Sequence, residues 1–136
     1  VDRIMQHPFT MVASDGRYTA MGKGHPHPRN YGTFPRVLGH FVREKMVLSL
    51  EEAIRKMTSL PASLMGLTDR GEIAEGQFAD ITIFDPETIS DKGTFTDPHH
   101  YPEGIKWVIV NGEITVDGED YIDARAGMVL RGPAYN

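Results

Sequence analysis

The chain has 136 residues, enough for one domain with a hydrophobic core, and it contains no cysteine, which excludes disulfides and a cysteine-based zinc site within it. Its formal net charge of −5 gives no support to binding of nucleic acid or of a membrane surface through a basic face, and we expect neither partner. The sequence has no signal-peptide pattern and no apolar run near the ~18 residues of a membrane span, so we expect a soluble, cytoplasmic protein.

The first predicted element is a short buried strand, Met11–Ser14, which stops at Asp15 and Gly16. Parallel α/β enzymes present a catalytic acid or base at the carboxyl end of such a strand, and glycine permits the turn that follows. Asp15 is therefore a candidate catalytic residue. The alternative is that Asp15 only caps the next turn.

A loop rich in Gly and Pro, residues 16–35, follows Asp15 and contains His25, His27 and Arg29. Loops of this length in a compact domain are usually functional or mobile. An H-x-H spacing on a strand would aim both imidazoles to one side, as metal ligands require. The interleaved prolines instead favour polyproline II, which splays the two rings apart, so we expect loop-shaping roles rather than a zinc pair.

Charge is distributed unevenly between the two halves of the chain. Residues 1–60 carry nine Lys and Arg against five Asp and Glu, a net +4, whereas residues 61–136 carry five against fourteen, a net −9. A basic first half would suit an anionic ligand. Alternatively, the two halves simply face different neighbours.

Helices are predicted next. The first predicted helix begins at Pro35. His40 lies on its polar side, and we expect a structural role for this residue. Ser49 opens the second through the S-x-x-E spacing of a capping box, and Pro61 ends it. A further short turn, Pro61–Met65, stops at Gly66. The apolar face of the first helix comprises Val37, Leu38, Phe41, Val42 and Met46.

The second half changes to the periodicity of strands. Asn111-Gly112 is a strong two-residue hairpin signal between two of them. The connection 85–104 is polar, and a solvated turn is expected for His99-His100 within it. The predicted strands lie within Gly71–Gly76, Phe78–Phe84, Ile105–Val110 and Glu113–Val116, with Met128–Leu130 as a possible addition.

Several motifs together resemble the C-terminal part of the N-acyl-D-amino-acid deacylases, the D-aminoacylase group of the amidohydrolase superfamily. The specific motifs are Ser14-Asp15-Gly16, His25-Pro26-His27-Pro28-Arg29 and Gly32-Thr33-Phe34-Pro35-Arg36-Val37-Leu38-Gly39. The more general signature includes Arg70-Gly71-Glu72-Ile73, Ala79-Asp80-Ile81 and Val110-Asn111-Gly112. The resemblance covers roughly residues 5–132.

The resemblance implies a fold of class α/β: the last strand and helices of a metal-dependent (β/α)₈ hydrolase barrel, followed by the C-terminal part of a small antiparallel β-sandwich domain. Residues 1–66 would end the barrel, with an active-site loop at 16–35, and residues 67–136 would belong to the β-sandwich. Because a (β/α)₈ barrel takes ~250 residues, the chain is expected to be a fragment. Its beginning at Val rather than Met agrees with this expectation.

The resemblance also implies a reaction and a set of residues. The parent enzyme would use zinc to hydrolyse the amide bond of N-acyl-D-amino acids, releasing a carboxylate and a free D-amino acid. Asp15 would be both a metal ligand and the general base and acid, while the other zinc ligands would lie in the missing N-terminal part. Arg29 and His27 would bind the substrate, Arg29 through its α-carboxylate. A structural Arg29, paired with a loop carboxylate, is the alternative.

Other functions stay open at this stage. One is a different amidohydrolase activity, that of an N-acyl-D-glutamate or D-aspartate deacylase, or of a dihydroorotase-like or hydantoinase-like enzyme. Another is a non-catalytic, β-rich binding module. The expected partners are the N-terminal remainder of the same protein and a small N-acyl amino acid. The isolated chain, with a helix face meant to pack on a missing sheet, is expected to be inactive and to self-associate.

Overall fold

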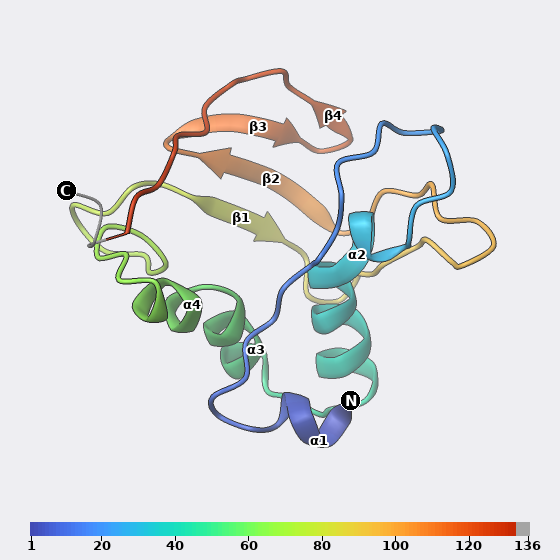
Figure 1. The fold of residues 1–136 in the computed structure, drawn as a ribbon, viewed down its shortest axis with the longest axis horizontal. Helices are drawn as coiled ribbons and strands as arrows, with labels where there is room; N and C mark the ends of the chain where they lie inside the picture. Colours follow the sequence, from blue (N-terminus) through green and yellow to red (C-terminus); the bar gives the residue numbers. More distant parts are fainter. Residues whose placement is uncertain (133–136) are drawn as a thin grey trace.

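The computed structural model of the protein describes residues 1–132. Helices come first along the chain and an antiparallel sheet follows, and the two groups lie on opposite sides of the molecule (Figure 1). The helices are α1 (Asp2–Met5), α2 (Arg29–Arg36), the π-helix η1 (Val37–Glu44), α3 (Leu50–Met57) and α4 (Ser59–Leu64). The strands are β1 (Ile81–Phe84), β2 (Ile105–Val110), β3 (Glu113–Asp117) and β4 (Asp120–Tyr121).

The sheet has the simple order β1-β2-β3-β4, with every neighbouring pair antiparallel. The predicted hairpin at Asn111-Gly112 is confirmed: both residues have positive φ, 50° and 85°, as a type I′ turn requires. Strand β2 has the predicted bounds, whereas β1 forms only the second half of the predicted Phe78–Phe84. The two-residue strand β4 was not predicted.

Three predicted strands do not form. Residues Met11–Ser14 run as an irregular segment, held by a hydrogen bond from the Val12 N–H to the Lys56 carbonyl at 3.2 Å. A parallel strand needs hydrogen-bonding neighbours, and residues 1–132 provide none for this segment. At Gly71–Gly76 the two glycines have φ of 96° and 83°, so the backbone turns where the alternation suggested a strand. Residues Met128–Leu130 are also irregular.

The first long helix begins six residues earlier than predicted, at Arg29 instead of Pro35. Pro35 therefore lies inside α2, where it lacks the N–H that would continue the α-helical ladder. The chain goes on as η1, in which the Lys45 N–H donates to the carbonyl of His40, five residues back, at 2.9 Å. The π-type hydrogen bonds thus follow directly after the proline that interrupts the α-helical ladder.

The second predicted helix is confirmed at its start and corrected at its end. The Ser49 Oγ accepts a hydrogen bond from the Glu52 N–H at 3.2 Å, which is the cap that the S-x-x-E spacing indicated. Helix α3 ends at Met57, and Pro61 lies in the first turn of α4, where its missing N–H costs nothing. Gly66 adopts the predicted left-handed conformation after α4, with φ of 70°.

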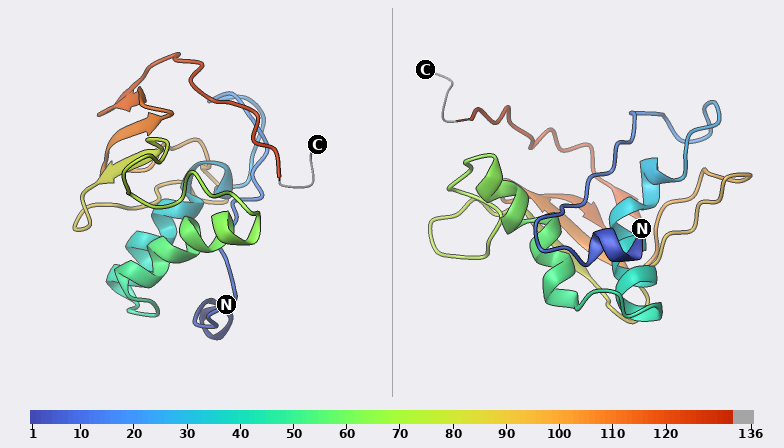
Figure 2. Two further views of the ribbon diagram at one scale, coloured as in Figure 1. Left: turned by 90° about the vertical axis from the view of Figure 1, so that its left-hand side faces the viewer. Right: turned by 60° about the horizontal axis from the view of Figure 1, so that its bottom comes forward.

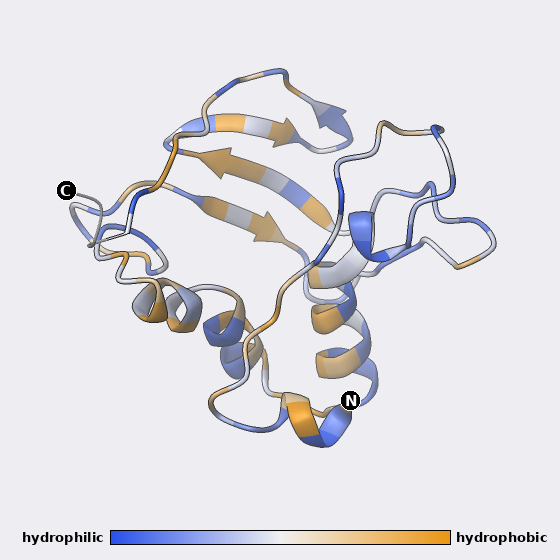
Figure 3. Ribbon diagram, viewed as in Figure 1, coloured by the Kyte–Doolittle hydropathy of each residue, from blue (hydrophilic) through white to orange (hydrophobic). Residues whose placement is uncertain are grey.

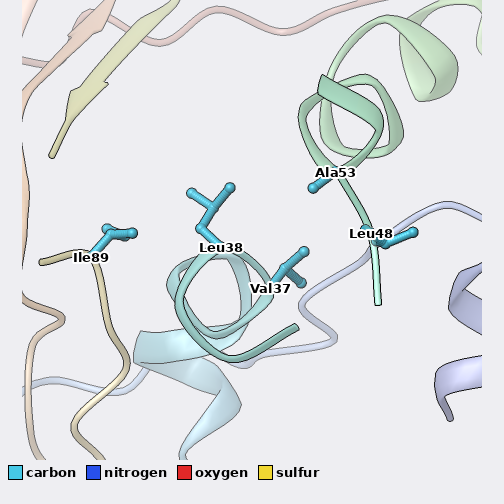
Figure 4. Close-up of a cluster of buried hydrophobic side chains, with 5 residues drawn as sticks. All are labelled: Val37, Leu38, Leu48, Ala53 and Ile89. Atoms are coloured by element: carbon cyan, nitrogen blue, oxygen red, sulfur yellow. The ribbon is translucent and has the colours of Figure 1, made fainter. Parts of the chain in front are cut away.

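The core joins the helices to the connection between β1 and β2 (Figure 4). Ile89, in that connection, is only 1 % exposed and clusters with residues of η1 and α3. The contact is close, because a Cβ on Gly39 would lie 2.5 Å from the Ile89 carbonyl oxygen. The buried cluster comprises Val37, Leu38, Leu48, Ala53 and Ile89. The β1–β2 connection is thus packed on the helices that follow the 16–28 segment.

Lys56 anchors the N-terminal segment that leads to Asp15. Its side chain is 1 % exposed, and its Nζ donates to the carbonyls of His7 at 2.6 Å and Thr10 at 2.9 Å. Glu52 lies 3.4 Å from the same Nζ. A hydrogen bond from Arg55 lowers the pKa of Glu52 to about 2, so this carboxylate keeps its charge beside Lys56 until the pH falls towards that value. Glu52 therefore remains a charged partner beside the Lys56 Nζ throughout the neutral range.

Replacing Lys56 by Met is expected to lower the free energy of unfolding by about 3 kcal/mol, because the carbonyls of His7 and Thr10 lose the donor that the buried Nζ gives them and Glu52 loses a partner. Chemical denaturation of the two proteins measures the difference. Lys92→Met is the matched control: Lys92 is also paired, with Glu103 at 3.0 Å, but both side chains are exposed and the pair should contribute less than ~1 kcal/mol. Equal effects of the two substitutions would contradict an anchoring role for Lys56.

None of the helices within residues 1–132 is both long enough and apolar enough to cross a membrane.

Apolar side chains are exposed on the sheet, and Figure 3 shows the hydrophobic residues along β1, β2 and β3. Ile83, Trp107 and Ile114 are 42 %, 40 % and 43 % exposed. The pairing of Ile83 with Trp107 and of Ile109 with Ile114 places these side chains on one face of the sheet.

Candidate active site

Asp15 directly follows the irregular segment 11–14. Its φ is 45°, in the left-handed region that Asp and Asn tolerate better than most residues. The following Gly16 packs against helix α2, because a Cβ there would be 3.1 Å from the Cα of Asn30. The Asp15 side chain is 82 % exposed. The carboxylate of Asp15 is thus presented to solvent, while the backbone of Gly16 stays against the helix.

Arg29 is the first residue of α2, and its Nη2 lies 2.8 Å from Oδ2 of Asp15. The fold therefore brings together two of the predicted site residues, which are fourteen positions apart in the sequence. A cation at a helix N-terminus is unfavourable in the field of the helix dipole, and the Asp15 carboxylate offsets it. Arg29 does pair with a carboxylate, as the structural alternative supposed, but that carboxylate is the candidate catalytic one.

The two histidines of the 16–28 loop form contacts with other residues of this chain. The His25 Nε2 lies 2.7 Å from the Phe95 carbonyl oxygen. The His27 Nδ1 accepts a hydrogen bond from the Arg29 N–H at 3.0 Å, and its ring meets the edge of Phe95 with centroids 4.9 Å apart. The two imidazoles thus shape the loop, as the interleaved prolines predicted. A role of His27 in substrate binding stays a prediction.

His99 is not the solvated turn residue expected from the sequence. Its ring is half-buried and contacts the 16–28 loop: Nδ1 lies 3.1 Å from the Gly22 nitrogen, and Nε2 lies 3.0 Å from the Gly24 oxygen. The expectation was wrong because these partners are about 75 residues away along the chain, so no local pattern could indicate them. His100 is exposed and pairs with Asp97 at 2.7 Å.

His40 has the structural role predicted for it. Its Nδ1 lies 2.8 Å from Oε2 of Glu44, one helical turn further along η1. This hydrogen bond lowers the pKa of Glu44 from its usual range. His40 therefore belongs to the surface of the helix, where its contacts are with Glu44 and Phe41 and not with the candidate site.

Asp15 is the metal ligand that the sequence predicted for this chain. Within residues 1–132 there is no group of three or more His, Asp or Glu side chains that could hold a metal. Asp15 has an exposed carboxylate, a group that zinc accepts as one of several ligands. The described residues therefore do not form a complete metal site by themselves, and Asp15 fits such a site as one of its ligands.

Comparison with known proteins gives consistent matches. The sequence family described as "Amidohydrolase family" matches residues 1–116. The chain is 48 % identical over 130 residues to an N-acyl-D-aspartate deacylase of Alcaligenes xylosoxydans xylosoxydans, a match that covers 96 % of this chain and 26 % of that protein. The chain thus spans about a quarter of the length of this relative.

Solved structures give the same result. An N-acyl-D-glutamate deacylase from Bordetella bronchiseptica, complexed with zinc and a phosphonate mimic of the tetrahedral intermediate, is 42 % identical with a TM-score of 0.85, and the match covers 96 % of this chain and 27 % of that one. A D-aminoacylase, described with a binuclear metal centre, is 40 % identical with the same TM-score, over 93 % of this chain and 26 % of that one.

Proposed function

This chain belongs to the amidohydrolase family, and from that membership we propose that it is the C-terminal segment of a zinc-dependent enzyme that hydrolyses N-acyl-D-amino acids to a carboxylate and a free D-amino acid. The observation that carries the proposal is the contact of Asp15 with Arg29 at 2.8 Å. This contact puts a carboxylate able to move protons beside a guanidinium able to bind a substrate carboxylate. The similarity to N-acyl-D-amino-acid deacylases supplies the substrate class.

Asp15 is the proton-transfer residue of the proposed reaction. Amide hydrolysis needs a base to accept a proton from the attacking water and an acid to return that proton to the leaving nitrogen, and one carboxylate can do both in turn. A zinc ion, when bound, polarises the amide carbonyl and lowers the pKa of bound water towards ~7. Asp15 would hold this ion together with ligands from the N-terminal part of the protein.

Arg29 and His27 are the substrate-binding residues of the proposal. An N-acyl amino acid keeps a free α-carboxylate, and a planar guanidinium binds such a group with two parallel hydrogen bonds. Arg29 is 44 % exposed, so it can meet a ligand while it remains beside Asp15. His27 has one ring nitrogen engaged by the Arg29 N–H, which leaves Nε2 as the atom to meet the substrate.

The proposed domain division assigns residues 1–66 to the end of a (β/α)₈ barrel and residues 67–136 to a β-sandwich. Its last four residues, 133–136, lie outside the described part. The segment Met11–Ser14, which has no strand neighbour within residues 1–132, supports the first assignment. The exposed apolar face at Ile83, Trp107 and Ile114 supports the second, because a sandwich would cover it with another sheet.

The comparisons support the alternative functions to different degrees. A preference for an acidic side chain, as in N-acyl-D-aspartate deacylase, would be a variant of the same reaction, and the 48 % identity to that enzyme favours it as a second candidate. A non-catalytic binding module has no comparable support. Side-chain preference would be decided by residues outside this chain.

The proposal is tested by the zinc content and the hydrolytic activity of the full-length protein that carries this chain. We expect bound zinc and release of free D-amino acids from N-acetyl-D-amino acids, including N-acetyl-D-aspartate. The 136-residue chain alone should bind no stoichiometric zinc and show no activity. It should also sediment as more than a monomer, because its apolar sheet face is uncovered. The helix face expected from the sequence to cause this association does not do so, because Val37 and Leu38 are buried in the core of the chain itself. A zinc-free or inactive full-length protein would contradict the proposal, and a monodisperse monomer of the chain would contradict the uncovered face.

A further inference from the structure

We propose that His99 is a positioning residue for the active site: together with Phe95 it clamps the 16–28 loop and thereby fixes Arg29. This inference rests on the proposed function. Both residues belong to the β1–β2 connection (residues 85–104), which no sequence motif linked to the site. Figure 1 shows this connection running beside the 16–28 loop, and the second view in Figure 2 shows the same neighbourhood.

The His99 ring binds the loop backbone on both sides of Lys23. Its Nδ1 accepts a hydrogen bond from the Gly22 N–H at 3.1 Å, and its Nε2–H donates to the Gly24 carbonyl at 3.0 Å. These two bonds together require the neutral ring with the proton on Nε2. Nδ1 is also 3.0 Å from the hydroxyl of Tyr31, two residues beyond Arg29 on α2. One imidazole thus joins the loop to the helix that carries Arg29.

Phe95 forms the second arm of the clamp. Its carbonyl oxygen accepts a hydrogen bond from the His25 Nε2–H at 2.7 Å. Its ring, 73 % exposed, meets the His27 ring edge-on at 83°. Because the His27 Nδ1 accepts from the Arg29 N–H at 3.0 Å, the contact reaches Arg29 through a single intermediate residue.

The connection is itself fixed on helix α2, so it can serve as a rigid support. Asp91 accepts a hydrogen bond from Arg36 at 3.0 Å, and a Cβ on Gly32 would lie 2.6 Å from the Asp91 Cβ. The rings of Tyr31 and Tyr101 pack edge to face with centroids 5.8 Å apart. The clamp is separate from the buried core, whose members are Val37, Leu38, Leu48, Ala53 and Ile89. Loss of His99 should therefore loosen the loop without unfolding the protein.

The test is His99→Ala in the full-length protein, with His100→Ala as the matched control because His100 pairs with Asp97 and not with the loop. A displacement of about 1 Å in a binding group can cost roughly 100-fold, so we expect a 10- to 100-fold fall in kcat/KM, mostly as a rise in KM. His99→Asn, which keeps an acceptor near the Gly22 N–H, should restore part of the loss. Unchanged kinetics in His99→Ala, or an equal loss in His100→Ala, would overturn the inference.

A double-mutant cycle with Arg29→Lys separates positioning from general damage. If His99 acts through Arg29, His99→Ala should cause little further loss in the Arg29→Lys background, whereas an undiminished loss would overturn the inference.

Trypsin cleavage of the Lys23–Gly24 bond gives a readout that does not depend on activity. In His99→Ala the bond should be cut several-fold faster than in the wild type, and an unchanged rate would overturn the clamp. If the wild-type protein hydrolyses no N-acyl amino acid, the proposed function fails, and this cleavage rate still decides whether the clamp exists.

Discussion

Asp15→Asn in the full-length protein should lower kcat by roughly 10³-fold, with a much smaller change in KM. The amide can neither accept the proton of the attacking water nor return one to the leaving nitrogen. Asn is the appropriate replacement because it tolerates the left-handed backbone at this position, where φ is 45°. The side chain is 82 % exposed, so the free energy of unfolding should hardly change. Steady-state hydrolysis of an N-acetyl-D-amino acid measures the effect.

The metal content of the same variant separates the two roles proposed for Asp15. An Asn variant that keeps its zinc and loses activity identifies proton transfer as the main role, whereas loss of both identifies metal binding. Asp117→Asn is the control, because Asp117 accepts a hydrogen bond from the Trp107 Nε1 at 2.7 Å on the sheet and has no part in the site. An Asp15→Asn enzyme with more than about a tenth of wild-type kcat would contradict the catalytic assignment.

Local signals in the sequence predicted the elements that depend on local interactions. The Asn111-Gly112 turn and the Ser49 cap each need only a few neighbouring residues, and both are confirmed. Met11–Ser14 has the composition of a buried strand, but a strand forms only where another supplies hydrogen bonds, and residues 1–132 contain no such neighbour. The predicted start of the first long helix was wrong because a proline is typical of the first turn of a helix. Here α2 begins at Arg29 and contains Pro35 near its end.

The candidate site shows the same division. Asp15, His27 and Arg29 were identified because strand-end chemistry and a specific motif placed them within fifteen positions. The contact between Asp15 and Arg29 at 2.8 Å follows from the close packing of Gly16 on α2 and from the start of that helix at Arg29, both of them local. His99 and Phe95 could not be found in this way, since their partners are 68 or more residues distant in sequence. Contacts of that range depend on how the β1–β2 connection packs on the helices.

Arg29→Lys should lower kcat/KM for N-acyl-D-amino acids by roughly 100-fold, mainly by raising KM. Lysine keeps the positive charge beside Asp15 but loses the planar fork that binds a carboxylate with two hydrogen bonds. The informative comparison is with the matching N-acyl amino acid amides, in which a neutral carboxamide replaces the α-carboxylate. The wild type should prefer the acid strongly, and in the variant this preference should largely disappear because both substrates then lack a bidentate partner.

Arg17→Lys is the control for this experiment, since Arg17 lies in the same loop and has the same charge. Its backbone carbonyl, not its side chain, bonds to Asn30, so the substitution leaves that contact in place. If Arg29 binds the substrate carboxylate through two parallel hydrogen bonds, Arg29→Lys should remove the preference for the acid and Arg17→Lys should not. If Arg29 contributes only to the positive field of the loop, Lys should serve equally well at both positions, and the preference would instead weaken with rising salt concentration. Retention of the preference in Arg29→Lys would therefore contradict the bidentate role of Arg29, and a retained preference that does not change with salt would leave Arg29 only its pairing with Asp15.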